Sequence, residues 1–141
     1  MSNFGGHYDI TIHDGTRVFI PAKLRDEFNG KAVVCRPLNK MRCIFIYTKE
    51  SWNDFVKRSE QLYTGEALVY FKTYINSTMN ELPVDKQGRL NIGQEFAEYA
   101  DLTHDITLVG AGTHLQLWDK DILAQSLASE STSFDPSLLS Y

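Results

Sequence analysis

The nine residues Val84-Asp85-Lys86-Gln87-Gly88-Arg89-Leu90-Asn91-Ile92 have a counterpart 72 positions earlier in the chain. The earlier copy is Ile12-His13-Asp14-Gly15-Thr16-Arg17-Val18-Phe19-Ile20, so that Arg17 falls on Arg89 and Val18 falls on Leu90. In both copies an apolar residue recurs at every second position after a turn-forming stretch, which is typical of a strand with one buried face. We therefore expect a duplicated supersecondary unit, which constrains the fold more than any other feature of the chain.

The first copy predicts a strand, a turn, a strand, a short helix and two more strands. Residues 7–20 are expected to form a β-hairpin that turns at Asp14-Gly15. Pro21 is favourable at the first position of a helix, and Asn29-Gly30 would end that helix. Apolar strands should follow at residues 32–35 and 43–47, and the first unit is expected to span residues 7–50.

The second copy repeats this order. Phe96 and Ala100 take the helix positions of Leu24 and Phe28. Apolar strands are expected at residues 106–109 and 115–118, at nearly the same offset as the rest of the repeat. The second unit should therefore span residues 81–124.

Residues 51–80 are expected to form a helical connector. Ser51 could cap a helix with Asp54 three residues on, and apolar residues recur at spacings of three and four in two successive runs. Both helices need something to cover, and two interpretations are open: they pack on the sheets, or they bridge to a neighbouring chain. Asp119 could cap a last helix, and the serine-rich residues 125–141 are expected to be a flexible tail.

Composition places the chain among ordinary globular proteins that can bury a core. It has 141 residues, of which 43% are hydrophobic, and no run approaches the 18 apolar residues of a membrane span. With no secretion signal, a cytoplasmic location is expected, and Cys35 and Cys43 should be free thiols. No membrane association is expected.

The charge is unevenly distributed along the chain. The net charge is −4, but residues 1–60 carry +3 and residues 61–141 carry −7. A polyanion would be attracted to the first half and repelled by much of the second. The same asymmetry would favour a head-to-tail contact between unlike halves of neighbouring copies, which can close into a ring.

No enzyme site can be assembled from the sequence. The four histidines are scattered at positions 7, 13, 104 and 114, without metal-ligand spacing or a supporting catalytic arrangement. Gly110-Ala111-Gly112 follows a strand but leads into another strand, so a phosphate-binding loop is not expected. No cofactor, metal or small-molecule substrate is predicted.

Arginine at the same place in both turns is the more informative feature. The guanidinium groups of Arg17 and Arg89 could contact a phosphate or a guanine in the major groove, which a two-stranded ribbon can enter. The alternative is that Asp85 and Arg89 pair with each other and only stabilise their turn. Lys23 and Arg25, in the helix after Pro21, add positive charge to the first copy, where the second copy has Ala97 at the position of Arg25.

The two units together resemble the MraZ family of transcriptional regulators, whose members carry two SpoVT-AbrB-type domains in one chain. The family pattern is Asp-x-x-Gly-Arg, followed by a few strand residues, a proline and a helix with an arginine. Copy one keeps Arg17, Pro21 and Arg25 but has His13 and Thr16 in place of the acid and the glycine. Copy two keeps Asp85, Gly88 and Arg89 but has Gly93 and Ala97 in place of the proline and the helix arginine.

The resemblance implies an α+β fold, mostly β, made of two tandem swapped-hairpin (AbrB-like) β-barrel repeats that form an intrachain pseudo-dimer with short helices. It implies a sequence-specific, nucleoid-associated regulator that binds double-stranded DNA and assembles with copies of itself into a ring. The expected binding sites are repeated boxes upstream of the division and cell-wall gene cluster, including the protein's own promoter. Arg17, Arg89 and more weakly Arg25 are the implied DNA-binding residues, with Asp85 and Gly88 fixing the turn. Lys23 is a further DNA-binding candidate because of its positive charge beside Arg25.

A rival interpretation keeps the fold but not the nucleic acid. A ring-forming structural or protein-interaction module would tolerate His13, Thr16 and Ala97 at positions where the family pattern has an acid, a glycine and an arginine. Retention of duplex DNA by the assembled protein would separate the two interpretations, because binding to phosphates weakens steeply as salt rises.

Overall fold

The computed structural model describes residues 3–129 and 134–140. The strands are β1 (His7–Thr11), β2 (Arg17–Phe19), β3 (Lys31–Cys35), β4 (Ile44–Tyr47), β5 (Met79–Pro83), β6 (Arg89–Asn91), β7 (Asp105–Gly110) and β8 (Leu115–Asp119). The helices are α1 (Ala22–Arg25), α2 (Lys49–Glu60), α3 (Gly65–Thr78), α4 (Gln94–Tyr99) and α5 (Lys120–Ser129), with 3-10 turns η1 (Asp26–Phe28) and η2 (Pro136–Leu138). The element order of the first copy recurs in the second, as the duplication predicts.

The two copies exchange strands. Six strands form one antiparallel sheet in the order β1-β7-β8-β4-β3-β5. At one edge β1 of the first copy pairs with β7 of the second, and at the other edge β5 of the second copy pairs with β3 of the first. The order is symmetric about the pair β4–β8, so the repeats are related by a pseudo-two-fold axis, as a swapped-hairpin pseudo-dimer requires.

The remaining two strands form a separate ribbon on the same axis. In the ribbon β2 pairs with β6, and Val18 lies opposite Leu90, so the symmetry axis passes between these equivalent residues. Both side chains are only 1% exposed, and they belong to one hydrophobic core together with sheet residues and with apolar residues of α1 and α4. Neither repeat has a core of its own, and the two must therefore fold together.

The exchange contradicts one sequence-based prediction. Residues 7–20 were expected to form a local hairpin, but β1 and β2 belong to different sheets, and the pairing at the turn between them is an isolated bridge of His13 with Arg17. The turn itself forms where expected, with Asp14 and Gly15 at φ values of +52° and +75°. Alternation of apolar residues predicts a half-buried strand, but it does not identify the strand's partner.

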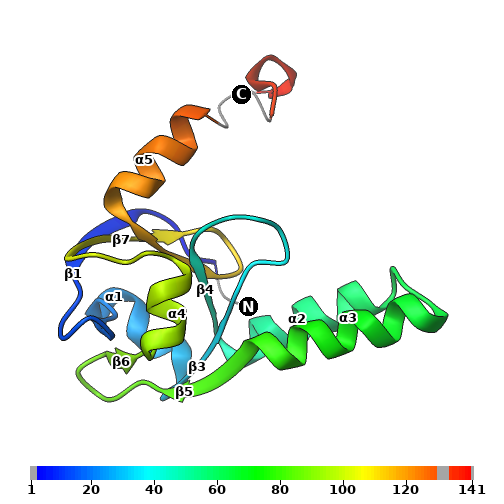
Figure 1. Cartoon of the computed structure of the whole chain (residues 1–141), viewed down its shortest axis with the longest axis horizontal. Helices are drawn as coiled ribbons and strands as arrows, with labels where there is room; N and C mark the ends of the chain where they lie inside the picture. Colours follow the sequence, from blue (N-terminus) through cyan, green and yellow to red (C-terminus); the bar gives the residue numbers. More distant parts are fainter. Residues whose placement is uncertain (1–2, 130–133, 141) are drawn as a thin grey trace.

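Helices α2 and α3 form a hairpin that projects away from the sheet (Figure 1). Near its base, Trp52, Phe71 and Ile75 pack on Val33 and Tyr47 on the face of the sheet opposite the main core. The connector is thus helical, and its base packs on the sheet. Elsewhere on the hairpin large apolar side chains remain exposed, such as Leu62 at 76%, between the two helices, and Tyr70 at 66%, within α3.

Two helix starts differ from the predicted positions. Thr48, not Ser51, caps α2: its hydroxyl accepts a hydrogen bond of 3.1 Å from the backbone N–H of Ser51, which lies buried in the first turn. Pro21 occupies the N-cap of α1 and not its first helical position, and it has an extended backbone there. In both cases the helix boundary differs from the predicted one by a few residues, the scale on which such boundaries vary.

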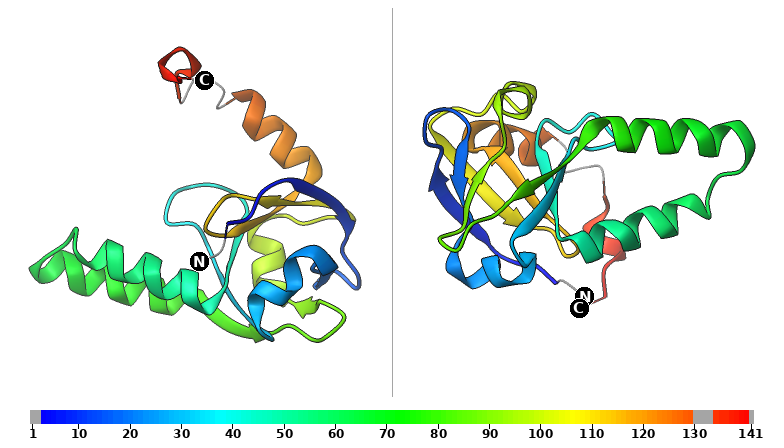
Figure 2. Two further views of the ribbon diagram at one scale, coloured as in Figure 1. Left: turned by 180° about the vertical axis from the view of Figure 1, so that it is seen from behind. Right: turned by 90° about the horizontal axis from the view of Figure 1, so that it is seen from below.

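The last helix begins where the sequence predicts. The carboxylate of Asp119 accepts from the backbone N–H of Ile122 at 3.2 Å and from the hydroxyl of Thr103. Helix α5 continues to Ser129 and so includes the first residues of the segment that we expected to be a tail. It leaves the body on the side away from β6 (Figures 1 and 2). None of the helices in the described ranges is long and apolar enough to cross a membrane.

Candidate nucleic-acid interface

One face of the ribbon is exposed and carries both arginines. The register pairs Arg17 with Asn91 and Phe19 with Arg89, and these four residues are exposed while Val18 and Leu90 between them are buried. The alternation of a β-strand therefore directs one side chain set into the core and the other to solvent. The pseudo-two-fold axis presents equivalent arginines of the two repeats on the same surface.

In the first copy Arg17 has an acidic partner that the sequence comparison did not identify. Asp14 forms an ion pair with the guanidinium of Arg17, and the two side chains are 73% and 52% exposed. His13 takes the position of the family acid, but its ring packs edge-on against Phe19 at a centroid distance of 5.3 Å. Asp14 lies three residues before Arg17, whereas Asp85 lies four residues before Arg89, so alignment of the two copies does not reveal this pair.

In the second copy Asp85 organises the whole turn. One carboxylate oxygen accepts hydrogen bonds from the backbone N–H groups of Arg89, at 2.8 Å, and Gln87, at 3.0 Å. The other oxygen pairs with the Arg89 guanidinium. Desolvation alone would raise the pKa of Asp85, but the hydrogen bonds and the positive charge of Arg89 outweigh it, so this pKa lies below its ordinary value.

Both ion pairs are on the surface, and neither guanidinium is covered. The side chains of Arg17 and Arg89 are 52% and 56% exposed. Exposed ion pairs contribute about 0–1 kcal/mol, so a phosphate or a guanine edge can replace the carboxylate at little cost. The alternative interpretation of Asp85 and Arg89 as a pair is thus correct as geometry, and it does not prevent Arg89 from binding an anion.

The two other predicted basic residues differ from each other. Lys23 is exposed on α1, next to the ribbon in sequence. Arg25 is only partly exposed, and its guanidinium donates to the backbone carbonyl of Lys86 at 3.1 Å and to that of Ile20 at 3.3 Å. Arg25, the weaker DNA-binding candidate, therefore contacts the turn of the other repeat.

Phe19 and Asn91 are members of the exposed face that the sequence comparison missed. They are equivalent positions in the two copies, but their side chains differ, so the repeat drew no attention to them. The side-chain oxygen of Asn91 accepts a 3.0 Å hydrogen bond from the backbone N–H of Gly93, which leaves its NH₂ group free to donate. The signal that could have identified both residues is their place two positions from an exposed arginine along a strand.

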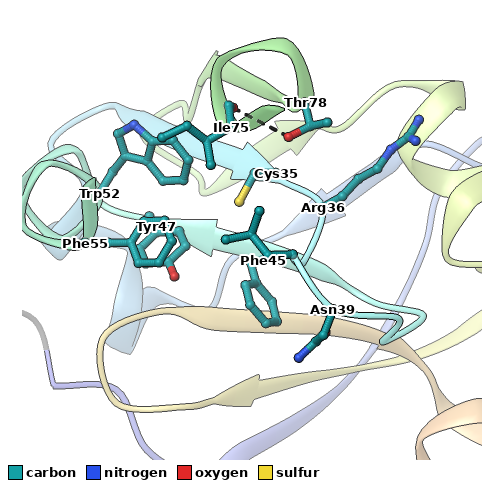
Figure 3. Close-up of a pocket in the computed structure, with 10 residues that line it drawn as sticks. Cys35, Arg36, Asn39, Phe45, Tyr47, Trp52, Phe55, Ile75 and Thr78 are labelled. Atoms are coloured by element: carbon teal, nitrogen blue, oxygen red, sulfur yellow. Dashed lines mark hydrogen bonds between the residues drawn. The ribbon is translucent and has the colours of Figure 1, made fainter. Parts of the chain in front are cut away.

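A cavity of about 320 Å³ lies on the face of the six-stranded sheet that is turned away from the main core, between the sheet and the base of the helical hairpin (Figure 3). Its lining is largely apolar and aromatic, and includes Cys35, Tyr47 and Trp52. Burial raises the pKa of both thiols, Cys35 and Cys43, to about 12, which favours the protonated over the thiolate form. Cys35 and Cys43 are free cysteines, as predicted.

Within residues 3–129 and 134–140, no group of three or more His, Cys, Asp and Glu side chains could hold a metal ion. The predicted site residues Arg17 and Arg89 come together on the ribbon, Asp85 and Gly88 lie in the turn before β6, and Lys23 and Arg25 lie on the adjoining helix α1.

Comparison with known protein families supports this architecture. A family model with the description "MraZ protein, putative antitoxin-like" matches residues 3–67 and 77–137. Each matched segment contains one copy of the duplicated unit, and together they cover most of the 141 residues. The MraZ proteins are regulators and not a family of enzymes. The chain therefore belongs to the MraZ family, a family of DNA-binding regulators.

Proposed function

We propose that this protein is a sequence-specific transcriptional regulator that binds double-stranded DNA through the β2–β6 ribbon. The observation that carries the proposal is the placement of Arg17 and Arg89 on one exposed face, related by the pseudo-two-fold axis of the ribbon. A two-stranded ribbon fits the width of the major groove, and arginine can donate two hydrogen bonds to a guanine edge or to a phosphate. Lys23, exposed on the adjoining helix, supplies a further phosphate contact.

The two halves of the site are not expected to contribute equally. The second copy lies in the acidic part of the chain, which carries −7, whereas the first copy lies in the part that carries +3. Arg89 is also held more closely, because Asp85 and Gln87 both accept from its guanidinium. Arg17, with Asp14 as its ion-pair partner, is therefore the stronger contact.

Self-assembly would compensate for the weak affinity of a net acidic chain. Helix α3 of the α2–α3 hairpin exposes apolar side chains, including Val69 at 61%, Tyr70 at 66% and Tyr74 at 43%. A surface of this kind favours the second interpretation of these helices, contact with a neighbouring copy. A ring of copies could engage repeated DNA boxes at once, which multiplies the affinity of each unit. We propose the upstream region of the division and cell-wall genes, including the protein's own promoter, as the target in the nucleoid.

The test measures binding of the full-length protein to a duplex that spans the upstream region of its own gene. Fluorescence anisotropy at several salt concentrations should show steep weakening as salt rises, because each phosphate contact releases counterions. Arg17→Ala should weaken binding by roughly 10- to 100-fold and Arg89→Ala by less, in line with the about 1–3 kcal/mol of a good arginine contact. Lys57→Ala, which removes an exposed positive charge from α2, is the control and should bind like the parent protein.

The outcome distinguishes this function from the rival one. Equal binding by the parent and both arginine variants would show that the ribbon does not touch DNA. No retention of DNA at any salt concentration, by protein that is still assembled in light scattering, would favour a structural or protein-interaction module. Arginine variants that lose DNA but keep their assembled mass would support the proposal.

A further inference from the structure

Arg25 belongs to the first repeat, but its guanidinium contacts the turn of the second. Its Nη1 donates to the carbonyl of Lys86 in that turn, and its Nη2 donates to the carbonyl of Ile20, where β2 ends. The Nε atom is buried and makes no hydrogen bond within the part of the chain that the structure describes. The side chain thus joins the two repeats beside the turn that carries Arg89.

Gly88 provides the space that this guanidinium occupies. A Cβ atom at position 88 would lie 3.0 Å from Nε and 3.2 Å from Cζ of Arg25, and 2.3 Å from the carbonyl oxygen of Ile20. The guanidinium therefore lies against the bare backbone of Gly88. A side chain at position 88 and the guanidinium of Arg25 cannot share this space.

The duplication supplies an internal comparison. Each turn makes the same backbone hydrogen bond with the opposite repeat. The N–H of Ile20 donates to the carbonyl of Gly88 at 2.8 Å, and the N–H of Ile92 donates to the carbonyl of Thr16 at 3.0 Å. At the positions equivalent to Arg25 and Gly88, however, the chain has Ala97 and Thr16. Arginine and glycine therefore meet at one of the two equivalent contacts between the repeats, and both are replaced at the other contact, as expected if the two residues act as a pair.

We infer that Arg25 is a positioning residue that holds the turn of Arg89 in its DNA-binding shape, and that it does not itself contact DNA. The inference rests on the proposed function, because the shape matters only if Arg89 binds. It follows that the two turns differ: a side chain of the opposite repeat fixes the Arg89 turn, whereas the Arg17 turn has no such support from Ala97.

Amide hydrogen exchange of the full-length protein, followed by NMR without DNA, tests the positioning role. Arg25→Ala should raise the exchange rates of the Gly88 and Arg89 amides by roughly tenfold, since local opening becomes easier when supporting hydrogen bonds are lost. The Thr16 and Arg17 amides of the other turn serve as the internal control and should not change. Equal acceleration in both turns, or in neither, would overturn the inference.

DNA affinity supplies the second readout. Arg25→Ala should weaken binding several-fold in the parent protein and equally in an Arg17→Ala background, but have almost no effect in an Arg89→Ala background. The salt dependence, given by the steepness of log affinity against log salt, should be the same in the Arg25→Ala, Arg89→Ala double variant as in Arg89→Ala alone. If Arg25 contacted a phosphate directly, Arg25→Ala would instead reduce the steepness by about 0.9 in every background.

Arg25→Lys keeps the charge and separates the two roles even if the alanine variant does not fold. A lysine cannot reproduce the two hydrogen bonds that the planar guanidinium donates to separate carbonyls. A positioning role therefore predicts that Arg25→Lys has amide exchange rates and DNA affinity close to those expected for Arg25→Ala. Parent-like affinity of Arg25→Lys would instead identify a direct charge contact. If no variant or parent binds DNA, the proposed function fails, and the exchange experiment still decides whether Arg25 holds the turn.

Discussion

Replacement of Gly88 by alanine should be much more damaging than replacement of Gly15, although both glycines lie in equivalent turns at positive φ. Gly88 has a φ of +85°, and Gly15 has a φ of +75°. An alanine in this region costs about 1–2 kcal/mol, and the gain from a less flexible unfolded chain is the same for both substitutions. The conformational terms therefore nearly cancel in the comparison.

The difference comes from the neighbouring atoms. A Cβ at position 88 would lie 2.3 Å from the carbonyl oxygen of Ile20, which is backbone and cannot simply rotate away, whereas a Cβ at position 15 meets no heavy atom within 4 Å. Displacement of the backbone at Ile20 weakens two hydrogen bonds. The N–H of Ile20 donates to the carbonyl of Gly88 at 2.8 Å, and the carbonyl of Ile20 accepts from the guanidinium of Arg25 at 3.3 Å. With about 1 kcal/mol for each hydrogen bond, Gly88→Ala should cost roughly 2 kcal/mol more than Gly15→Ala.

Urea unfolding followed by far-UV circular dichroism measures this difference. Both variants and the parent should be compared at one protein concentration, because assembly would make stability depend on concentration. The expected losses in free energy of unfolding are about 3–4 kcal/mol for Gly88→Ala and about 1–2 kcal/mol for Gly15→Ala. Losses that agree within about 0.5 kcal/mol would refute the close contact between the repeats at Gly88.

Two further predictions concern other parts of the fold. The ring of His114 lies against Phe45 and Tyr47 at centroid distances of 4.2 and 4.9 Å, and burial lowers the pKa of His114 to about 4. The stability that the neutral ring contributes is fully present above the unfolded pKa of about 6.5, and it is lost as pH falls toward 4. As pH falls from about 6.5 to about 4, His114→Phe should therefore gain about 1 kcal/mol in free energy of unfolding relative to the parent, a value that allows for the partial exposure of the ring. A difference in urea midpoints that does not change with pH would contradict the lowered pKa of His114. Asp119→Ala removes the cap of α5 and the acceptor of Thr103 and should cost about 2–3 kcal/mol in thermal or urea unfolding. Asp121→Ala, which removes an exposed acid from the same helix turn, is the matched control, and similar losses for both would show that the cap contributes nothing.

Local elements were predictable because local chemistry specifies them. Alternating apolar residues predict β2 and β6, Asp14-Gly15 predicts a turn at positive φ, and Asn29-Gly30 predicts the end of the first helix, where Asn29 does adopt a left-handed conformation. The 72-residue repeat also predicts that the two halves share one order of elements. These features depend on residues close to one another in the chain, and their preferences act whatever the rest of the molecule does.

The partners of these elements could not be predicted from periodicity. The swap of β1 and β5 depends on which surface buries each strand, and only the resemblance to a known family suggested it. The ion pair of Arg17 with Asp14 joins residues three positions apart, whereas the equivalent pair of Asp85 with Arg89 joins residues four positions apart, so the repeat does not predict it.

The duplication, the strands and turns, and the two arginines at equivalent positions can all be read from the amino-acid sequence. The tertiary structure decided that these arginines share one exposed face, because the register of β2 on β6 sets both on the same side. It also decided that Arg25 contacts the turn of the opposite repeat. Both facts are long-range, since they arise only when two segments about 60 to 70 residues apart pack into one core that neither repeat could form alone.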